Sequence, residues 1–506
     1  MKRIITLTAE RNGKTMKRII SLLLSAIMLV GAMALVSCAL EDEEYAGNGD
    51  EGFVCGLGTT TPSTTIINKP SYFGNPTFDG AVVKFALASA VMGDLNSDGY
   101  RGCDVDEDNG DLIVSKVYKR NQNVEERFDV DIQVVECTDE KSLTELVTPI
   151  LLAGDDDIDC LWADQSYDID LCLNGFLLDL NKLDKSENYI ELDSSWWDGD
   201  YTKQYQYNDE LYWLSGPLSL TYLGGMSCVF VNEMLYDQYI LPDYGNIADI
   251  VRAGEWNIST LAKMSNDIYT KSGNKIMGSM LAGQENITQL LVGAGAEYTE
   301  RHADGTISLN LSSADSKYVS VAGSIMKMFT QVEGVSSLTS FGDSFAYGGQ
   351  LFRFGKLSDA YAFIEAEYNW LMVPTPKLNS NQSEYRTAMA SNNQIIGIAY
   401  TCRNVPAVTA TLEAMAAESC RLVTPAFYDY VLRYKYTRDD DTAEMLDIIS
   451  DSVYTDFGMA WERFILGSAW INGGKYDFST ITTLAKKENW ASNLKTVINK
   501  LDELSK

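Results

Sequence analysis

The chain contains a single histidine, His302, among its 506 residues. A zinc site with two histidine ligands is therefore impossible, and a Ser-His-Asp or Cys-His catalytic site would have to use this one ring. His302 stands beside Asp304-Gly305, a turn-forming pair where no surrounding shell would orient the ring. A P-loop and a G-x-G-x-x-G segment are also missing. We therefore expect no enzymatic activity, no cofactor and no metal.

Cysteine occurs nine times, but no two cysteines form a C-x-x-C pair. This absence argues against a zinc ribbon and against a thioredoxin-type motif. Cys160, Cys172 and Cys228 lie in apolar runs, so we expect them in the core. The pairing of the cysteines other than Cys38 stays open, because the sequence does not choose among the many possible connectivities.

Basic residues are scarce: 40 Lys and Arg stand against 71 Asp and Glu, which gives a formal net charge of −31. Such a field argues against nucleic acid as a partner. Pairs of carboxylates arise by chance among so many acids, so their presence does not by itself indicate a glycosidase. The repeating units of a (β/α)₈ barrel, a scaffold for such an enzyme, are not found. Asp94 to Gly99 begins like a calcium loop, but Val105 stands at the twelfth position, which needs a bidentate acid. We interpret this segment as a solvated acidic loop.

The N-terminus has the pattern of an export signal. A basic start precedes an apolar run from Ile19 to Val36, which ends in Leu35-Val36-Ser37-Cys38. Cysteine after Leu-Val-Ser resembles a bacterial lipobox, in which the thiol is acylated and the signal removed. We expect residues 1–37 to be a lipoprotein signal peptide, starting at Met1 or Met16, and Cys38 to anchor the protein on the extracellular face of the cell membrane. The alternative is a transmembrane anchor, but acidic residues at 41–44 replace a basic stop-transfer flank.

Residues 38–79 are acidic at first and then rich in Gly, Ser, Thr, Asn and Pro, which predicts a flexible tether. The rest of the chain is too long for one core, so we expect two lobes. Strand-like segments at 81–87, 130–135 and 158–162 alternate with helix-like segments at 112–128 and 141–153. This alternation is typical of the α/β class with mainly parallel sheets.

Several blocks, in order, resemble the extracellular solute-binding proteins of ABC importers (family 1-like, carbohydrate-binding branch). The Glu-Arg-Phe-Asp-Val-Asp-Ile of 126–132 is similar to the family's "ERFNVKI", and Gly-Phe-Leu-Leu-Asp-Leu at 175–180 to its "G-x-L-x-D-L". Phe354-Gly-Lys followed by Val373-Pro-Thr-Pro-Lys resembles "F-x-x-G-K … L-P-x-P-K", and 414–447 resembles lipoproteins of anaerobic Gram-positive bacteria. Val231-Asn-Glu departs from the family's usual "Y-N-K".

The resemblance implies a two-lobe periplasmic-binding-protein-like type II fold, each lobe a mainly parallel sheet flanked by helices, with the ligand in the cleft between them. Lobe one would be 80–217 plus 386–425, and lobe two 218–385 plus 426–506. The implied function is capture of a small ligand, a sugar or oligosaccharide, by a monomer that delivers it to ABC permease subunits and their ATPase. Alternatives are a peptide or other solute in the same fold, or a surface adhesion or scaffold lipoprotein without a transport role.

Sugars present hydroxyl edges and apolar faces, so a sugar site needs aromatic platforms together with carboxylates and amides. Residues of these types lie at predicted strand ends, near the crossovers between lobes and on one C-terminal helix. The candidate ligand contacts are Trp162, Asp164, Gln165, Tyr167, Trp213, Tyr222, Glu365, Trp370, Asn392, Asn393 and Trp461. For each, the alternative is ordinary packing or solvation; Trp196, Trp197 and Trp490 we interpret as packing or surface residues.

Replacing Cys38 by alanine is expected to abolish acylation, because the thiol is the atom that carries the lipid. Labelling cells with a radioactive fatty acid tests this, with Cys55→Ala as the control that leaves the lipobox intact. Label that survives Cys38→Ala, or an unlabelled wild-type chain, would contradict the lipoprotein prediction.

Overall fold

The computed structural model describes residues 76–88, 103, 105, 108, 110–137, 139–281, 283–310, 317–336, 345–363, 366–390, 393–433, 440–465 and 489–505. The predicted signal peptide, Cys38, the acidic 94–99 segment and most of the tether lie outside these ranges, as do Glu365 and Asn392. None of the helices in the described part of the chain combines the length and apolar composition needed to cross a membrane.

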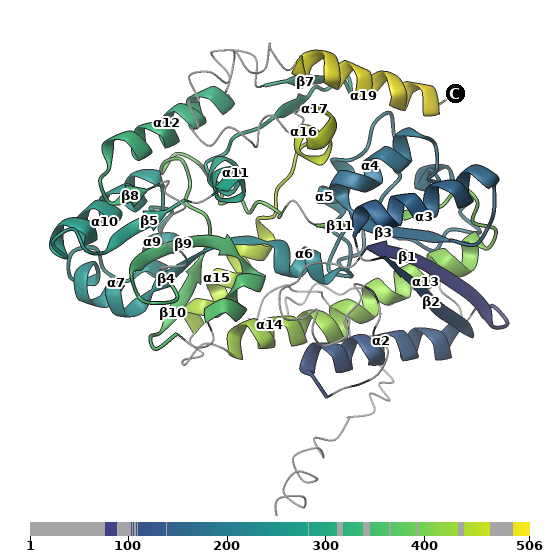
Figure 1. The fold of residues 1–506 in the computed structure, drawn as a ribbon, viewed down its shortest axis with the longest axis horizontal. Helices are drawn as coiled ribbons and strands as arrows, with labels where there is room; N and C mark the ends of the chain where they lie inside the picture. Colours follow the sequence, from purple (N-terminus) through teal and green to yellow (C-terminus); the bar gives the residue numbers. More distant parts are fainter. Residues whose placement is uncertain are drawn as a thin grey trace, which may run out of the picture. The chain divides into compact units, whose positions relative to one another are not determined.

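The first sheet has four strands in the order β11-β3-β1-β2. Strand β1 pairs in parallel with both β2 and β3, and β11 joins β3 antiparallel. Helices α2 and α13 cover one face and α3 and α4 the other (Figure 1). The strands are β1 Ala81–Ala88, β2 Val130–Cys137, β3 Cys160–Asp164 and β11 Gln394–Ile398; the helices are α2 Leu112–Phe128, α3 Glu140–Ala153, α4 Gln165–Leu173 and α13 Val405–Glu418.

Local capping explains where the first helices begin and end. The carboxylate of Asp111 accepts hydrogen bonds from the backbone N–H of Ile113 and Val114, which fixes the start of α2. Asp139 does the same for Ser142 at the start of α3. Gly154 ends α3 in the left-handed conformation at φ 76°, which glycine adopts without steric cost.

The second sheet has five strands in the order β10-β4-β9-β5-β8. Strand β5 pairs in parallel with β8 and β9, whereas β4 pairs antiparallel with β9 and β10, so this sheet is mixed and not mainly parallel as the resemblance implied. Helix α10 contacts β5, β8 and β9, and α15 contacts β10. The strands are β4 Ser227–Asn232, β5 Met277–Met280, β8 Val335–Ser336, β9 Gln350–Lys356 and β10 Trp370–Val373; the helices are α7 Glu233–Tyr239, α8 Leu241–Tyr244, α9 Ile247–Arg252, α10 Ile258–Lys271, α11 Gly283–Gly293, α12 Lys317–Gln331 and α15 Asp440–Asp451.

Shorter elements complete the described chain. A hairpin of β6 Thr299–Arg301 and β7 Ile307–Leu309 follows α11, and the predicted turn at Asp304-Gly305 joins its strands. A π-helix at Ser419–Val423 links α13 to α14. The remaining helices are α5 Gly199–Lys203, α6 Leu220–Gly225, α14 Thr424–Arg433, α16 Phe457–Ala460, α17 Glu462–Ile465 and α19 Trp490–Leu504, with 3-10 turns at Leu180–Lys182 and Leu357–Phe363.

Three chain segments lie side by side where the polypeptide passes between the two sheets. The N–H of Ser227 donates to Ala388 O at 2.9 Å, and the N–H of Ala390 donates to Gly225 O at 2.9 Å. On the other side of the middle segment, the N–H of Thr387 donates to Ser452 O at 2.8 Å and that of Tyr454 to Thr387 O at 2.9 Å. Residues 225–227, 387–390 and 452–454 therefore form one hydrogen-bonded ladder, which we call the crossing ladder.

The C-terminal part of the chain packs against elements of the first sheet. Helix α19 contacts α4 and α17, and the ring of Trp461 lies 5.2 Å from that of Trp213. We had predicted this segment in lobe two with the rest of 426–506, and the exact lobe boundaries stay a prediction. Cys160, Cys172 and Cys228 are buried, which confirms their place in the core, and Cys420 is disulfide-bonded.

A buried carboxylate fixes the loop that precedes α5. Glu413 on α13 is fully buried, and its two oxygens accept hydrogen bonds from the indole N–H of Trp196 at 2.7 Å and of Trp197 at 2.6 Å. The backbone N–H of Glu191 donates to the same carboxylate at 3.2 Å. The Trp196-Trp197 pair is therefore a packing element, as predicted.

Replacing Glu413 by leucine should lower the free energy of unfolding by about 3 kcal/mol, because two buried indole N–H groups lose their acceptor. Chemical denaturation measures the change. The matched control is Glu126→Leu on the exposed side of α2, for which the change should stay within about 0.5 kcal/mol. A Glu413→Leu protein as stable as the wild type would show that this carboxylate does not hold the loop.

Candidate functional site

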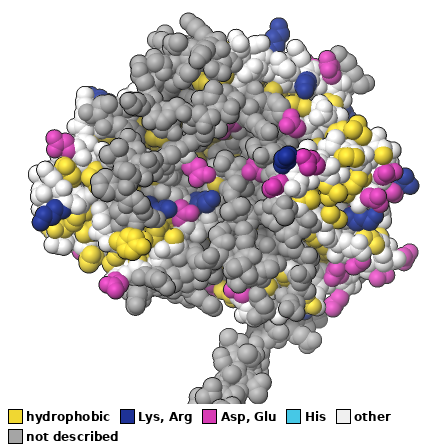
Figure 2. Space-filling model, viewed as in Figure 1, with side chains coloured by type: hydrophobic (Ala, Val, Ile, Leu, Met, Phe, Trp, Pro, Cys, Tyr) yellow, Lys and Arg dark blue, Asp and Glu magenta, His cyan; other side chains and the backbone are white. Residues whose placement is uncertain are grey.

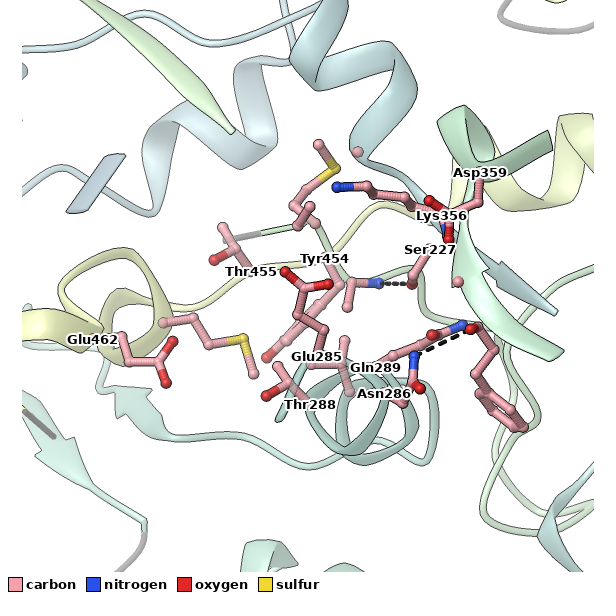
Figure 3. A pocket seen from close by; sticks show the side chains of 18 of the residues that line it. Ser227, Glu285, Asn286, Thr288, Gln289, Lys356, Asp359, Tyr454, Thr455 and Glu462 are labelled. Carbon is pink, nitrogen blue, oxygen red and sulfur yellow. Dashed lines mark hydrogen bonds between the residues drawn. The ribbon is translucent and has the colours of Figure 1, made fainter. Parts of the chain in front are cut away.

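A cavity of about 440 Å³ opens beside the crossing ladder. The ladder itself supplies Gly225, Ser227, Ala388 to Ala390, Tyr454 and Thr455 to its wall. Elements next to the first sheet supply Gln165 and Tyr201, and Met459 and Glu462 come from α16 and α17. The largest contribution comes from the second sheet and α11, as Figure 3 shows: Met280, Glu285, Asn286, Thr288, Gln289, Val292, Gln350, Arg353 to Lys356 and Asp359.

Helix α11 presents one polar face to the cavity. Glu285, Thr288, Gln289 and Val292 follow the spacing i, i+3, i+4, i+7, which places them on the same side of a helix. Gln289 is buried, and its Nε2 donates to Cys228 O at 2.7 Å and to Thr375 Oγ1 at 3.1 Å. Gln289 thus fixes α11 against β4, and the exposed Glu285 extends its carboxylate into the space (Figure 3).

The opposite part of this wall is the end of β9. Arg353 Nη1 pairs with Asp359 Oδ2 at 2.7 Å, so these two charges neutralise each other. Asn286 Nδ2 donates to Phe354 O at 3.2 Å and ties α11 to the same strand. Within the described part of the chain, Lys356 forms no ion pair.

Gln165 connects two elements that border the cavity. Its Oε1 accepts hydrogen bonds from Tyr205 OH at 2.6 Å and Tyr201 OH at 3.2 Å, and its Nε2 donates to Met459 O and Ala460 O at 3.2 and 3.1 Å. Burial raises the pKa of Tyr201 to about 12, so its hydroxyl stays neutral at physiological pH. Gln165 therefore joins α5 to α16 and supports the cavity wall.

Two acids, the buried Asp456 and the half-buried Glu462, stand at the α16–α17 end of the cavity. Asp456 accepts hydrogen bonds from the N–H groups of Tyr298 and Met459 and from Thr299 Oγ1, at 2.7, 3.0 and 3.0 Å. Burial nevertheless raises the pKa of Asp456 to about 6. Burial, and then the nearby charge of Asp456, raise the pKa of Glu462 to about 7. The Oε1 atom of Glu462 is buried and has no hydrogen-bond partner among the described residues.

Of the predicted ligand contacts whose side chains are described, Gln165 alone lines the cavity. Trp162, Trp213, Trp370, Trp461 and Tyr222 are buried among other aromatic rings or, for Tyr222, hydrogen-bonded to Asp198. Asn393 is buried with its Nδ2 at 3.4 Å from Tyr201 OH, and Asp164 is half-buried at the end of β3.

Tyr167 lies on α4, where its side chain is not described, and Glu365 and Asn392 fall outside the described residues. The assignment of all these residues as ligand contacts stays a prediction.

The residues on α11 and β9 were missed because their signal is tertiary. The apolar pattern of 283–293 indicates a helix but not which face meets a cavity. One local sign was present: polar Thr288 and Gln289 share a helix face with Glu285, opposite Leu290 and Leu291, which are buried. Among the described residues, no group of three or more His, Cys, Asp or Glu side chains could hold a metal ion.

No family model matches the sequence, and a search of curated proteins finds no match. Solved structures do match. The sugar-binding protein MalE from Xanthomonas citri has a TM-score of 0.53 at 11% identity, covering 84% of this chain and 99% of that one. An ABC substrate-binding protein, Lmo0181, from Listeria monocytogenes in complex with cycloalternan has a TM-score of 0.51 at 13% identity, covering 82% and 100%.

The galacto-N-biose/lacto-N-biose I-binding protein of an ABC transporter from Bifidobacterium longum, in complex with lacto-N-biose, also has a TM-score of 0.51, at 11% identity, covering 82% of this chain and 99% of that one. At these identities the likeness establishes the fold. The chain has the two-lobe α/β fold of maltose-binding-protein-like solute-binding proteins, which confirms the predicted fold class. The anaerobic Gram-positive origin of the resemblance stays a prediction.

Replacing Glu462 by glutamine should change how stability depends on pH. The folded chain keeps Glu462 protonated up to about pH 7, whereas the ordinary value for glutamic acid is 4.5. The stability from this group is therefore fully present below pH 4.5 and is lost as pH rises through 7. Relative to wild type, Glu462→Gln should gain about 1–3 kcal/mol in unfolding free energy between pH 4.5 and 8.

Chemical denaturation at both pH values gives this difference, and Glu126→Gln on α2 is the control that should show none. A Glu462→Gln protein whose stability changes with pH in the same way as that of wild type would refute the raised pKa of Glu462.

Proposed function

We propose that this protein is an extracellular solute-binding lipoprotein that captures a sugar or oligosaccharide and delivers it to the permease of an ABC transporter. The observation that carries the proposal is the cavity beside the crossing ladder. Residues next to the first sheet and residues of the second sheet both line this cavity. Pockets at the junction of two α/β units are where such folds bind small molecules.

The chemistry of the wall supports a hydroxylated ligand. Carboxylate, amide, hydroxyl and ammonium groups converge on the cavity from Glu285, Thr455, Gln350, Lys356 and Glu462. These groups supply both donors and acceptors, which sugar hydroxyls need in pairs. The half-buried Tyr454 adds apolar surface for the C–H face of a sugar.

The three similar structures are those of binding proteins, two of them in complex with oligosaccharides. The single histidine lies on the β6–β7 hairpin, where His302 Nε2 is 2.9 Å from Ser308 Oγ, and it does not line the cavity. A binding role without catalysis therefore accounts for the residues that line the cavity. Ligand binding would shift the population toward a closed arrangement of the lobes, while the crossing ladder continues to connect them.

The lipid anchor at Cys38 and the tether of residues 38–79 complete the proposal. They would hold the binding unit on the extracellular face of the membrane, within reach of the permease. The scattered acidic and basic side chains on the described part of the face in Figure 2 form no single basic patch that would favour nucleic acid. The protein acts as a monomer in this scheme.

A thermal-shift screen of the purified protein against monosaccharides, oligosaccharides and peptides tests the proposal. A bound sugar at a hundred times its Kd should stabilise the protein by about 2.7 kcal/mol. Glu285→Ala should weaken binding of that sugar about tenfold or more, because a carboxylate on the wall is lost, while Glu126→Ala should leave it unchanged. Stabilisation by peptides and by no sugar would refute the sugar ligand, and unchanged binding in Glu285→Ala would refute the cavity as its site.

A further inference from the structure

Among the described residues of the cavity wall, carboxyl groups outnumber ammonium groups once the one ion pair is set aside. Arg353 is paired with Asp359, which leaves Glu285, Glu462 and Lys356 as the charged groups without an ion pair among the described residues. Two of these three are carboxylates, and they come from different elements, α11 and α17. Glu285 and Lys356 are opposite in charge, and Glu462, whose pKa burial raises to about 7, becomes a second negative charge when a cation binds beside it, within a chain whose formal net charge is −31.

Glu462 is the less satisfied of the two acids. Its Oε1 is buried without a hydrogen-bond partner in the described part of the chain. The groups that act on it from the surrounding elements are Asp456, Tyr298 and Tyr318, and none of them carries a positive charge. A buried carboxylate with no donor and no cation is costly, so a ligand that supplies both gains the most by binding there.

We infer that the ligand carries a positively charged amino group, as an amino sugar does, and that this group binds at Glu462 with Glu285 on the facing wall. The inference rests on the proposed function and names its substrate class. An ammonium group provides three donors and a positive charge, whereas a sugar hydroxyl provides one donor and no charge. Charge-assisted hydrogen bonds to a carboxylate are also stronger than neutral ones.

Lys356 on the cavity wall repels a cationic ligand. Its ammonium group would attract an acidic sugar, but the carboxylate of Glu285 lies on the same wall, and Glu462 adds a second negative charge only when a cation binds beside it (Figure 3). The field of the whole chain also repels anions. The balance of charge therefore favours an amine over a carboxylate, and acidic sugars serve as a comparison in the test.

The experiment measures Kd by calorimetry for sugars that share one skeleton and differ at carbon 2. At carbon 2, glucosamine carries an ammonium, N-acetylglucosamine an acetamide and glucose a hydroxyl, and each is measured as the monosaccharide and as the β-1,4-linked dimer. Galactosamine and galactose repeat the comparison on a second skeleton. Glucuronic acid adds a negative charge. The amine should bind about tenfold tighter or more than its neutral counterparts. Glu462→Gln should remove most of this preference, and Glu126→Gln should keep it.

The outcomes separate the two proposals. Tighter binding of neutral, acetylated or acidic sugars than of the amine would overturn the inference while supporting a sugar-binding function. Binding of none of these sugars would overturn both. An amine preference that persists in Glu462→Gln would show that the positive charge is recognised elsewhere and would overturn the assignment to this residue.

Discussion

The crossing ladder is the constraint on which the rest of the site depends. Segments 225–227, 387–390 and 452–454 come from distant parts of the chain, yet their backbone groups satisfy one another at 2.8–2.9 Å. Because buried backbone donors and acceptors must be paired, this contact fixes where the two sheets are joined. The cavity lies against the ladder, so α11, β9 and the α16–α17 turn can supply one shared wall.

Most polar groups on that wall are already engaged, and this pairing gives the cavity its shape. Gln289 holds α11 to β4, Gln165 joins α5 to α16, and the Arg353–Asp359 pair closes the end of β9. Groups whose hydrogen bonds are made within the protein fix the position of the wall, and they have few donors or acceptors left for a ligand. The groups that remain, Glu285, Lys356 and Glu462, decide what the cavity prefers.

The strands of the first sheet could be predicted because their signal is local. The mainly apolar segments at 81–87 and 158–162 overlap β1 and β3, and the helix expected at 112–128 is α2. The candidate site was harder to predict. Trp162, expected at a strand end, and Trp213, expected beside a crossover, are fully buried, since large rings next to a sheet are stabilised by burial in the core, and their role as ligand contacts stays a prediction.

By itself the sequence determined the α/β class, the order of the elements and the scarcity of catalytic groups, because periodicity and composition depend on neighbouring residues alone. It also carried the expectation of an exported lipoprotein, which rests on residues 1–38. Only the tertiary structure decided which side chains share the cavity. Glu285 and Glu462 lie 177 positions apart in the sequence, and nothing in either local pattern pairs them; the backbone ladder between the sheets brings their helices to one wall.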